Sequence, residues 1–369
     1  MIYLDYQATT PLAPEARDAM LPWLDQFGNP HSPHRIGREA AAAVEIATAQ
    51  VAALLGDEQG RGRTIFTSGA TEAANWALQG AVQGERRKIV TLATEHACVL
   101  DTAAWLAQHG VELVVLPVQA NGLVDLDAAA SAIDERTALV AAMLVNNEIG
   151  VIQPVAALAE MAHGAGALLF CDAVQGFGRV DLPLHACDLV AVTAHKIHGP
   201  KGIGALWLRD GLSWPALVHG GGQQQGLRSG TLSPMLCAGF GAAAALAKQR
   251  HRQDGFHINL LSDLANELFE DWTLNGDAMR RYDGNRNLRR KGIDAGRLIS
   301  EVREVAFSAG SACASGSGRP SHVLRALGLS EAEARGSIRL GFGRYTTQEE
   351  LREAAVLINQ AAARQLEWA

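Results

Sequence analysis

The chain has 369 residues, of which 48% are hydrophobic and 19% are charged, and its formal net charge is −7. This composition is typical of a folded, soluble protein with roughly two or three domains, and it excludes a disordered chain. The acidic balance argues against general nucleic-acid binding and against binding to an anionic membrane, because both need a basic surface. We therefore expect no stable nucleic-acid partner and no membrane association.

The cysteine content indicates a reducing compartment. The five cysteines are odd in number and show no C-x-x-C spacing; they are Cys98, Cys171, Cys187, Cys237 and Cys313. This pattern argues against a disulfide framework, and no cluster of histidine, cysteine or carboxylate has metal-ligand spacing. The N-terminus MIYLDYQATTP lacks a basic stretch followed by an apolar run. We therefore expect no signal peptide, no metal and a cytoplasmic protein.

From about residue 64 to residue 209, short apolar runs alternate with helix-like segments. The runs are TIFTSG, KIVTLA, VELVVLPV, ALVAAMLV, ALLFCD, LVAVTA and IGALWL. Apolar runs without polar alternation are typical of strands that are buried on both faces. The alternation predicts an α/β fold with a mostly parallel, seven-stranded sheet covered by helices on both faces. Ligands are expected outside the carboxyl ends of such strands.

The sequence changes character beyond about residue 250. A helix-like stretch, HINLLSDLANELFEDW, is followed by a basic stretch and by a loop rich in Gly and Ser at about residues 308–320. We predict a large domain at residues 15–249, and a smaller α+β domain formed by residues 1–14 and 250–369. The basic stretch is interpreted as a solvated face, with a docking patch for an acidic partner as the alternative. Its cations are Arg280, Arg281, Arg286, Arg289, Arg290 and Lys291.

Two of the predicted strands end at polar residues. After the first strand, SGATE opens a helix, where Thr71 and the free amides of the first turn suit a phosphate; a plain helix cap by Ser68 or Thr71 is the alternative. Asp172 ends a strongly apolar strand and needs a cationic partner there, such as the protonated ring nitrogen of a cofactor. An aspartate that merely caps the next turn is the other reading.

A lysine and a cysteine are the candidate nucleophiles. A buried strand leads to Lys196 in a turn rich in Gly and Pro, where a lysine with a depressed pKa can attack an aldehyde. Lys201 competes for this role, and a plain surface lysine is the alternative for either. Cys313 lies among small residues in the late loop, which suits a thiolate that reaches a substrate and then a partner. The other cysteines are interpreted as packing residues.

Ten short motifs then occur in one order along nearly the whole chain. They are LDYQATTP, FGNPHSPH, SGATEAAN, TEHACV, NNEIGV, DAVQ, AHKIHGPKGIGAL, HGGGQQQGLRSGT, GSACASGS and SIRLGFGR. This series resembles the cysteine desulfurases of the class V aminotransferase group, in particular the NifS/IscS-like type that supplies sulfur for iron–sulfur clusters. The resemblance implies a pyridoxal 5′-phosphate enzyme of fold type I that works as a homodimer. Such an enzyme converts L-cysteine to L-alanine and carries the sulfur, as a persulfide, to an acceptor protein such as an iron–sulfur scaffold.

The resemblance also implies a set of site residues. Lys196 matches the lysine that binds the cofactor covalently, Cys313 matches the persulfide cysteine, and His96 matches the residue that stacks on the cofactor ring; these three are the expected catalytic residues. The positions that match phosphate contacts are Ala70, Thr71, Thr193, His195 and, from the neighbouring subunit, Thr231. Asp172 matches the partner of the pyridine nitrogen, and Gln175 the partner of the ring hydroxyl. Asn147, also a cofactor contact, and Arg339 match the residues that hold the substrate carboxylate.

The chain departs from the family pattern in two places. Thr193-Ala194 stands where the family usually has Ser-Gly, and the segment YDGNRNLRRKGIDAG lacks the usual Pro-Asn and any strand-like apolar run. The alternative functions are another class V enzyme, either a selenocysteine lyase or an aminotransferase, and a non-catalytic sulfur-transfer scaffold. The set Lys196, Asp172, His96 and Cys313 argues against a scaffold. The sulfur acceptor stays open among cluster assembly, transfer RNA modification and DNA modification.

Overall fold

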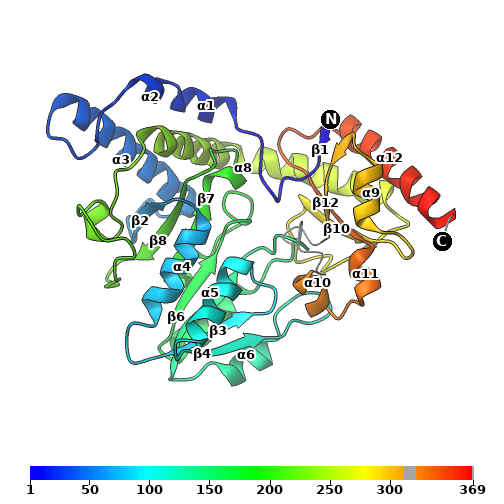
Figure 1. The fold of residues 1–369 in the computed structure, drawn as a ribbon, viewed down its shortest axis with the longest axis horizontal. Coiled ribbons are helices and arrows are strands. Elements are labelled where there is room, and N and C mark those ends of the chain that lie inside the picture. Colours follow the sequence, from blue (N-terminus) through cyan, green and yellow to red (C-terminus); the bar gives the residue numbers. More distant parts are fainter. Residues whose placement is uncertain (311–320, 368–369) are drawn as a thin grey trace.

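The computed structural model describes residues 1–310 and 321–367, and its largest sheet has seven strands (Figure 1). These strands are β2 (Gly62–Thr67), β3 (Lys88–Leu92), β4 (Glu112–Leu116), β5 (Thr137–Met143), β6 (Leu168–Asp172), β7 (Leu189–Thr193) and β8 (Gly204–Arg209). Their order is β2-β8-β7-β6-β5-β3-β4; β8 is antiparallel to both neighbours, and the other adjacent pairs are parallel. Each predicted apolar run forms one strand, so the predicted α/β fold with a mostly parallel seven-stranded sheet is confirmed.

Helices cover both faces of this sheet because its strands are apolar on both sides. In β5, Leu139 and Ala141 belong to one apolar core, whereas Val140 and Ala142 belong to another. This alternation follows from the geometry of a strand, whose successive side chains point to opposite faces. The helices of this part of the chain are α3 (Arg35–Leu55), α4 (Ala70–Ala81), α5 (Ala97–Ala107), α6 (Leu126–Ala132) and α7 (Val155–Gly164).

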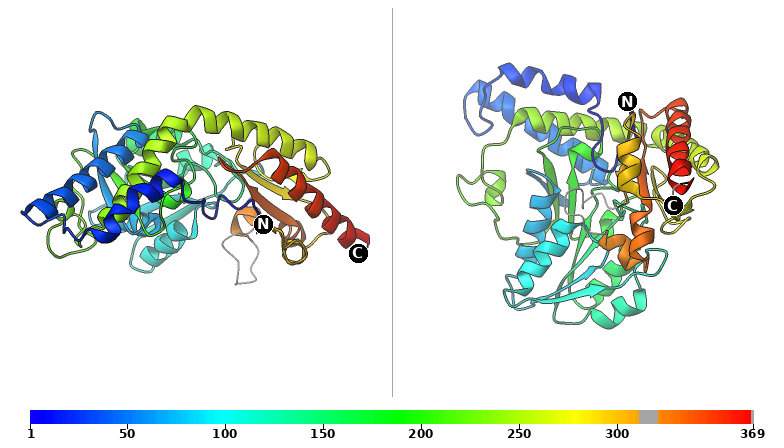
Figure 2. Two further views of the ribbon diagram at one scale, coloured as in Figure 1. Left: turned by 90° about the horizontal axis from the view of Figure 1, so that it is seen from above. Right: turned by 45° about the vertical axis from the view of Figure 1, so that its right-hand side comes forward.

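One long helix, α8 (Pro234–Leu268), runs from the sheet to the C-terminal part of the chain (Figures 1 and 2). It packs closely on α3: a Cβ atom at Gly241 would lie 2.6 Å from the Cα atom of Ala47, so a larger residue does not fit. Two short helices, α1 (Pro14–Met20) and α2 (Pro22–Asp25), also contact α8. The expected domain boundary after residue 249 falls within α8, which is continuous there.

A smaller, antiparallel sheet forms the C-terminal part. Its strands, in spatial order, are β12 (Ser308–Ala309), β13 (Ser337–Gly341), β10 (Asn285–Arg289) and β9 (Thr273–Leu274). The N-terminal strand β1 (Ile2–Tyr3) pairs with β11 (Val305–Ala306), so the start of the chain lies beside this sheet (Figure 1). The helices here are α9 (Ala295–Glu301), α10 (His322–Ala326), α11 (Glu331–Arg335) and α12 (Gln348–Glu367). Short 3-10 turns lie at Leu184–Ala186, Ala194–Lys196 and Gln224–Gly226.

The interpretation of the basic stretch as a solvated face holds for Arg280 and Lys291, which are exposed, but it was wrong for Arg281 and Arg286. Arg281 and Arg286 are 5% and 4% exposed. Arg281 donates hydrogen bonds to the carbonyl oxygens of Ile149 (3.1 Å) and Asn285 (2.6 Å), and Arg286 donates to the hydroxyl of Ser262. These guanidinium groups therefore join loops within the protein, and they are not available as a docking patch. Among residues 1–310 and 321–367, the helices are too short or too polar to cross a bilayer.

Candidate active site

A pocket of about 620 Å³ lies where several parallel strands of the large sheet end, which is where the sequence predicted a ligand. Ten of the twelve predicted site residues line it: Ala70, Thr71, His96, Asn147, Asp172, Gln175, Thr193, His195, Lys196 and Arg339. Thr231 is exposed and does not line this pocket. Cys313 lies outside the residues that the structure describes. The competing lysine, Lys201, also lines the pocket.

The N-terminus of α4 faces this pocket and is suited to an anion. The helix begins at Ala70 after Gly69, and no side chain caps it, so the alternative of a helix cap by Ser68 or Thr71 was wrong. The carboxylate of Glu72 instead accepts the backbone N–H of Ser68 (2.8 Å) and pairs with Arg228 (2.8 Å). The first amides of a helix have no partner within it, and the helix dipole adds positive potential. This turn can therefore hold a phosphate group.

Asp172 places a buried carboxyl group in the same pocket. It is the last residue of β6, it is 5% exposed, and its Oδ1 accepts the backbone N–H of Val174 at 3.0 Å. Burial raises the pKa of Asp172, while the nearby charges of His96 and Lys196 lower it. Within the described part of the chain it makes no ion pair. A ligand with a protonated ring nitrogen would satisfy this carboxylate.

Lys196 lies at the end of the 3-10 turn that follows β7. Its Nζ donates hydrogen bonds to the carbonyl oxygens of Gln7 and, at 2.7 Å, of Ala8. Burial, followed by the charge of Lys196, lowers the pKa of the neighbouring His195 to about 4. The imidazole of His195 is therefore neutral at pH 7, and one ring nitrogen contacts the hydroxyl of Thr9 at 3.2 Å. A neutral imidazole can still donate a hydrogen bond to an anion.

The remaining predicted residues complete the walls of the pocket. His96 caps α5, and its Nδ1 accepts the backbone N–H of Cys98 at 3.1 Å. The side-chain amide of Gln175 donates to the carbonyl oxygen of Gln7 (2.9 Å) and accepts from Arg179 (2.7 Å). The hydroxyl of Thr193 donates to the carbonyl oxygen of Ile203 at 3.1 Å. These hydrogen bonds hold each side chain in a defined position at the pocket.

Sequence reasoning did not assign several residues of this site. Gln7, Ala8 and Thr9 line the pocket from the N-terminal segment, and the motif LDYQATTP was the available signal. Cys98, interpreted as a packing residue, also lines the pocket, whereas Cys171, Cys187 and Cys237 are buried as expected.

Burial raises the pKa of Cys98, so this residue is a protonated thiol at pH 7. Glu95, next to His96, is fully buried and accepts the backbone N–H of Met143 at 2.6 Å. Its burial, together with the charge of Asp172, raises its pKa well above the ordinary value. Two neighbouring carboxyl groups in one low-dielectric region therefore resist carrying two negative charges together.

The donor set fits pyridoxal 5′-phosphate. An uncapped helix N-terminus can receive the phosphate, Asp172 can face the ring nitrogen, and Lys196 offers an amine for the aldehyde. His96, on the wall of the same cavity, offers an imidazole for contact with the ring. Among residues 1–310 and 321–367, no group of histidine, cysteine and carboxylate side chains is arranged to hold a metal ion.

Comparison with known proteins agrees with this geometry. A family model described as aminotransferase class-V matches residues 2–353. A cysteine desulfurase IscS from Rickettsia bellii (strain OSU 85-389) is 44% identical over 370 residues, which cover 97% of this chain and 90% of that relative. A solved NifS-like protein has a TM-score of 0.90 at 29% identity, over 98% of this chain and 99% of that chain. The structure of SspA in complex with cysteine has a TM-score of 0.81 at 33% identity, over 94% and 100% of the two chains. The chain therefore belongs to the class V aminotransferase family and, within it, to the pyridoxal-phosphate-dependent cysteine desulfurases.

Proposed function

We propose that this enzyme removes the sulfur of L-cysteine in the pocket around Lys196, holds it as a persulfide on Cys313 and passes it to an acceptor protein. One observation carries the proposal. A single cavity is lined by an amine, a buried carboxylate and a buried guanidinium, which are Lys196, Asp172 and Arg339. The guanidinium suits the carboxylate of an amino-acid substrate, whereas the amine and the carboxylate suit the aldehyde and the protonated ring nitrogen of an electron-accepting cofactor.

Each wall of the pocket has a separate task in this proposal. The first amides of α4, at Ala70 and Thr71, hold the cofactor phosphate together with Thr193 and neutral His195. Asp172 keeps the ring nitrogen protonated, because a buried carboxylate without a counter-charge is costly. His96 lies against the ring, and Gln175 faces the ring hydroxyl.

The substrate is held and deprotonated by two further side chains. Arg339 binds the carboxylate of L-cysteine, with Asn147 beside it, and thereby sets which bond of the α-carbon faces the base. Pyridoxal phosphate, when bound, supplies the ring that stabilises negative charge at that carbon. Lys196 takes the α-proton as a general base.

The sulfur transfer needs no external oxidant or reductant. The thiolate of Cys313 attacks the substrate sulfur, an S–S bond forms and the C–S bond of the substrate breaks. The former Cβ carbon then takes a proton, so that L-cysteine and one thiol become L-alanine and one persulfide. The nucleophile has to be a thiolate, because a protonated thiol such as Cys98 attacks poorly.

We propose a homodimer, in which Thr231 of one subunit completes the phosphate site of the other. Thr231 is exposed and does not line the pocket of its own chain. Leu24 and Phe27, at and after the end of α2, are 66% and 86% exposed, which favours a partner surface over this region. Sedimentation that yields a monomeric mass would contradict the dimer.

We also propose a large domain at residues 15–249 and a small domain formed by residues 1–14 and 250–369. We further propose a cytoplasmic location and an iron–sulfur scaffold as the sulfur acceptor.

The test measures two products at once. The purified protein is incubated with L-cysteine, and free alanine and protein-bound persulfide are quantified together. We expect equal amounts in a first turnover, and we expect Cys313→Ser to keep the visible absorption of the bound cofactor while forming no persulfide. Full persulfide formation by Cys313→Ser would overturn the assignment of the sulfur carrier, and absence of alanine with the wild type would overturn the function.

A further inference from the structure

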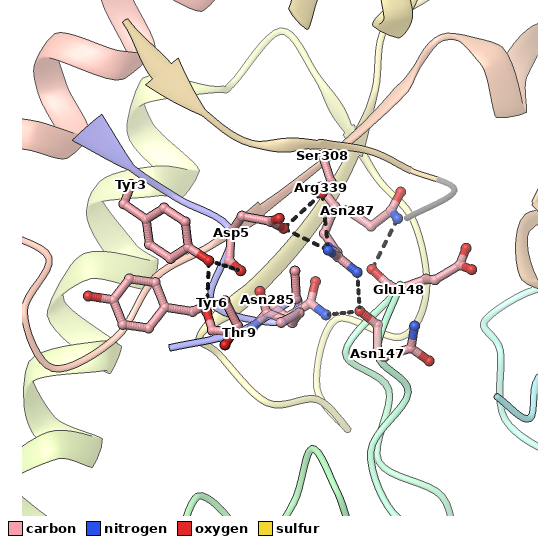
Figure 3. Close-up of polar contacts among 12 residues, drawn as sticks. Tyr3, Asp5, Tyr6, Thr9, Asn147, Glu148, Asn285, Asn287, Ser308 and Arg339 are labelled. Atoms are coloured by element: carbon pink, nitrogen blue, oxygen red, sulfur yellow. Dashed lines mark hydrogen bonds and ion pairs between the residues drawn. The ribbon is translucent and has the colours of Figure 1, made fainter. Parts of the chain in front are cut away.

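The guanidinium group of Arg339 is held by three separate segments of the chain. It lies within β13, and its side chain is 1% exposed. Its Nη2 donates to Asp5 Oδ1 at 2.7 Å and to Ser308 Oγ at 3.2 Å, and its Nη1 donates to the carbonyl oxygen of Asn147 at 3.0 Å (Figure 3). The Nε atom is buried and has no partner in the described part of the chain. The protein therefore fixes the plane of the group and leaves donor capacity unused.

Asp5 provides the negative charge that this buried cation needs. An unpaired charge in the interior is strongly destabilising. Among the described residues, Asp5 is the ion-pair partner of Arg339. The same oxygen of Asp5 also accepts the hydroxyl proton of Ser308 at 2.8 Å. The three side chains thus form a closed set in which each group contacts the other two (Figure 3).

Asp5 is itself held in place from two sides. Its backbone forms a bridge with Gly341, the last residue of β13. The hydroxyl of Tyr3 donates to the carbonyl oxygens of Asp5 (3.1 Å) and Thr9 (2.8 Å), which closes a turn around the aspartate (Figure 3). Burial, followed by the charge of Asp5, raises the pKa of Tyr3 to about 12, so Tyr3 remains a donor at every physiological pH.

Only one partner of this ion pair lines the pocket. Arg339 lines the pocket, whereas neither Asp5 nor Ser308 does. The aspartate therefore contacts the arginine outside the space that a substrate would occupy, and it does not compete for that space. A carboxylate at this distance from a guanidinium restrains its orientation through a charge-assisted hydrogen bond.

We propose that Asp5 is a positioning residue for substrate binding, which orients Arg339 towards the carboxylate of the amino-acid substrate, with Ser308 as its helper. The inference rests on the proposed function, in which Arg339 binds that carboxylate. An interaction that is equally present in the bound substrate and in the transition state changes KM and leaves kcat nearly unchanged. Loss of Asp5 therefore weakens binding of L-cysteine without slowing the chemical step.

The experiment compares Asp5→Asn with Asp254→Asn. Asp254 forms an ion pair with Arg344 at 2.7 Å and a second one with Arg250 at 3.1 Å. Its side-chain exposure of 17%, against 5% for Arg344, closely matches the 19% and 1% of Asp5 and Arg339. Among the described residues, the Asp254 carboxylate pairs with Arg250 and Arg344 and makes no hydrogen bond or ion pair with Arg339, so this variant controls for the loss of buried ion pairs. We expect Asp5→Asn to raise the KM for L-cysteine by about 10-fold, equivalent to about 1.4 kcal/mol of binding free energy, because it removes a buried charge-assisted hydrogen bond. The kcat should stay within about 3-fold.

Two further measurements complete the test. L-Alanine carries the same carboxylate, so its inhibition constant should rise in Asp5→Asn by the same factor as KM. Ser308→Ala removes the hydrogen bonds of Ser308 with Asp5 and Arg339 but keeps the ion pair between them, so it should raise KM by about 3-fold. This variant keeps the idea testable if Asp5→Asn fails to fold. Asp254→Asn should lower the melting temperature comparably and leave KM within about 2-fold.

The outcomes separate this inference from the function on which it rests. If the wild type forms no alanine from L-cysteine, the proposed function fails. If the wild type is active and Asp5→Asn shows an unchanged or lower KM, or equal losses in kcat and kcat/KM, the positioning role is overturned. A KM increase of equal size in Asp254→Asn would assign the effect to general loss of stability and would also overturn it.

Discussion

The two larger sheets of this protein place polar residues in different ways. In the seven-stranded sheet the strand interiors are apolar, and the reactive groups follow at the strand ends, as with Asp172 after Cys171 and Lys196 in the turn after β7. In the four-stranded sheet polar side chains lie inside the strands, where Asn287 and Arg339 are directly paired and almost fully buried. In the seven-stranded sheet the polar groups can therefore bind a ligand. In the four-stranded sheet most polar groups are hydrogen-bonded to other parts of the protein.

The comparison assigns different consequences to the two regions. Substitutions at the edge of the large sheet should change the chemistry and leave the fold intact. Substitutions inside the small sheet should change stability or substrate binding, because their polar groups are part of a buried hydrogen-bond network. Three variants test this division.

The largest effect is expected for Lys196→Ala, at the edge of the large sheet. Loss of the amine removes the proposed base, and alanine formation should fall by about 10³-fold or more, equivalent to about 4 kcal/mol of barrier. The melting temperature should change little, because Lys196 lines the pocket in the short turn after β7 and is not part of an apolar core. The control is Lys201→Ala, which removes an exposed lysine of the same pocket and should cost less than about 5-fold. A reversed order of the two losses would assign the role to Lys201.

The second effect is a loss of stability in Asn287→Ala, inside the small sheet. Asn287 is fully buried; its side chain donates to the carbonyl oxygen of Glu148 (3.0 Å) and accepts from Asn275 (2.7 Å). Removing it leaves two buried groups short of a partner, at a cost of about 3 kcal/mol in the free energy of unfolding. The matched control is Asn359→Ala, whose side chain makes two hydrogen bonds at a half-buried position and should cost about 1 kcal/mol. Chemical denaturation measures both, and equal costs would contradict the distinction.

The smallest effect concerns His198, which lies two residues beyond Lys196 in the segment after β7. Its ring lies against Tyr6 and Tyr345, with ring centroids 5.9 and 5.0 Å away. Burial, followed by the charge of Arg344, lowers the pKa of His198 to about 4. Between pH 6.5 and pH 4 the unfolded chain therefore binds more protons than the folded protein, and stability falls as the pH is lowered through this window.

His198→Asn should reduce this acid sensitivity. Asparagine tolerates the left-handed backbone of this position (φ +68°) and does not titrate. Between pH 7 and pH 5 the wild type should lose about 1–2 kcal/mol more stability than the variant, as measured by denaturant midpoints at both pH values. An identical loss in both proteins would show that His198 is not responsible, and His195, whose pKa is also lowered to about 4, would be the next candidate.

Of the two larger sheets, the sequence predicted the seven-stranded one and missed the four-stranded one for a physical reason. Buried strands of a parallel sheet are continuous apolar runs, and all seven were recognisable. The strand β10, with the sequence NRNLR, has no apolar run, and it is buried because Asn287 and Arg286 find partners on other segments. A pattern of hydrophobicity does not show which distant residues form hydrogen bonds. Neither the strand β10 nor the burial of Arg281 and Arg286 could therefore be predicted from it.

The same distinction applies to the site. The amino-acid sequence alone determined the family, through ten ordered motifs, and it placed Asp172 and Lys196 at or just after strand ends. Arg339, which lies inside β13, was named only through the family resemblance. The tertiary structure alone decided that the helix at Ala70 is uncapped and that Asp5 is the ion-pair partner of Arg339, 334 positions away along the chain. Contacts of this kind depend on how distant segments pack. Local sequence specifies which charges need partners, and the fold specifies which partners they meet.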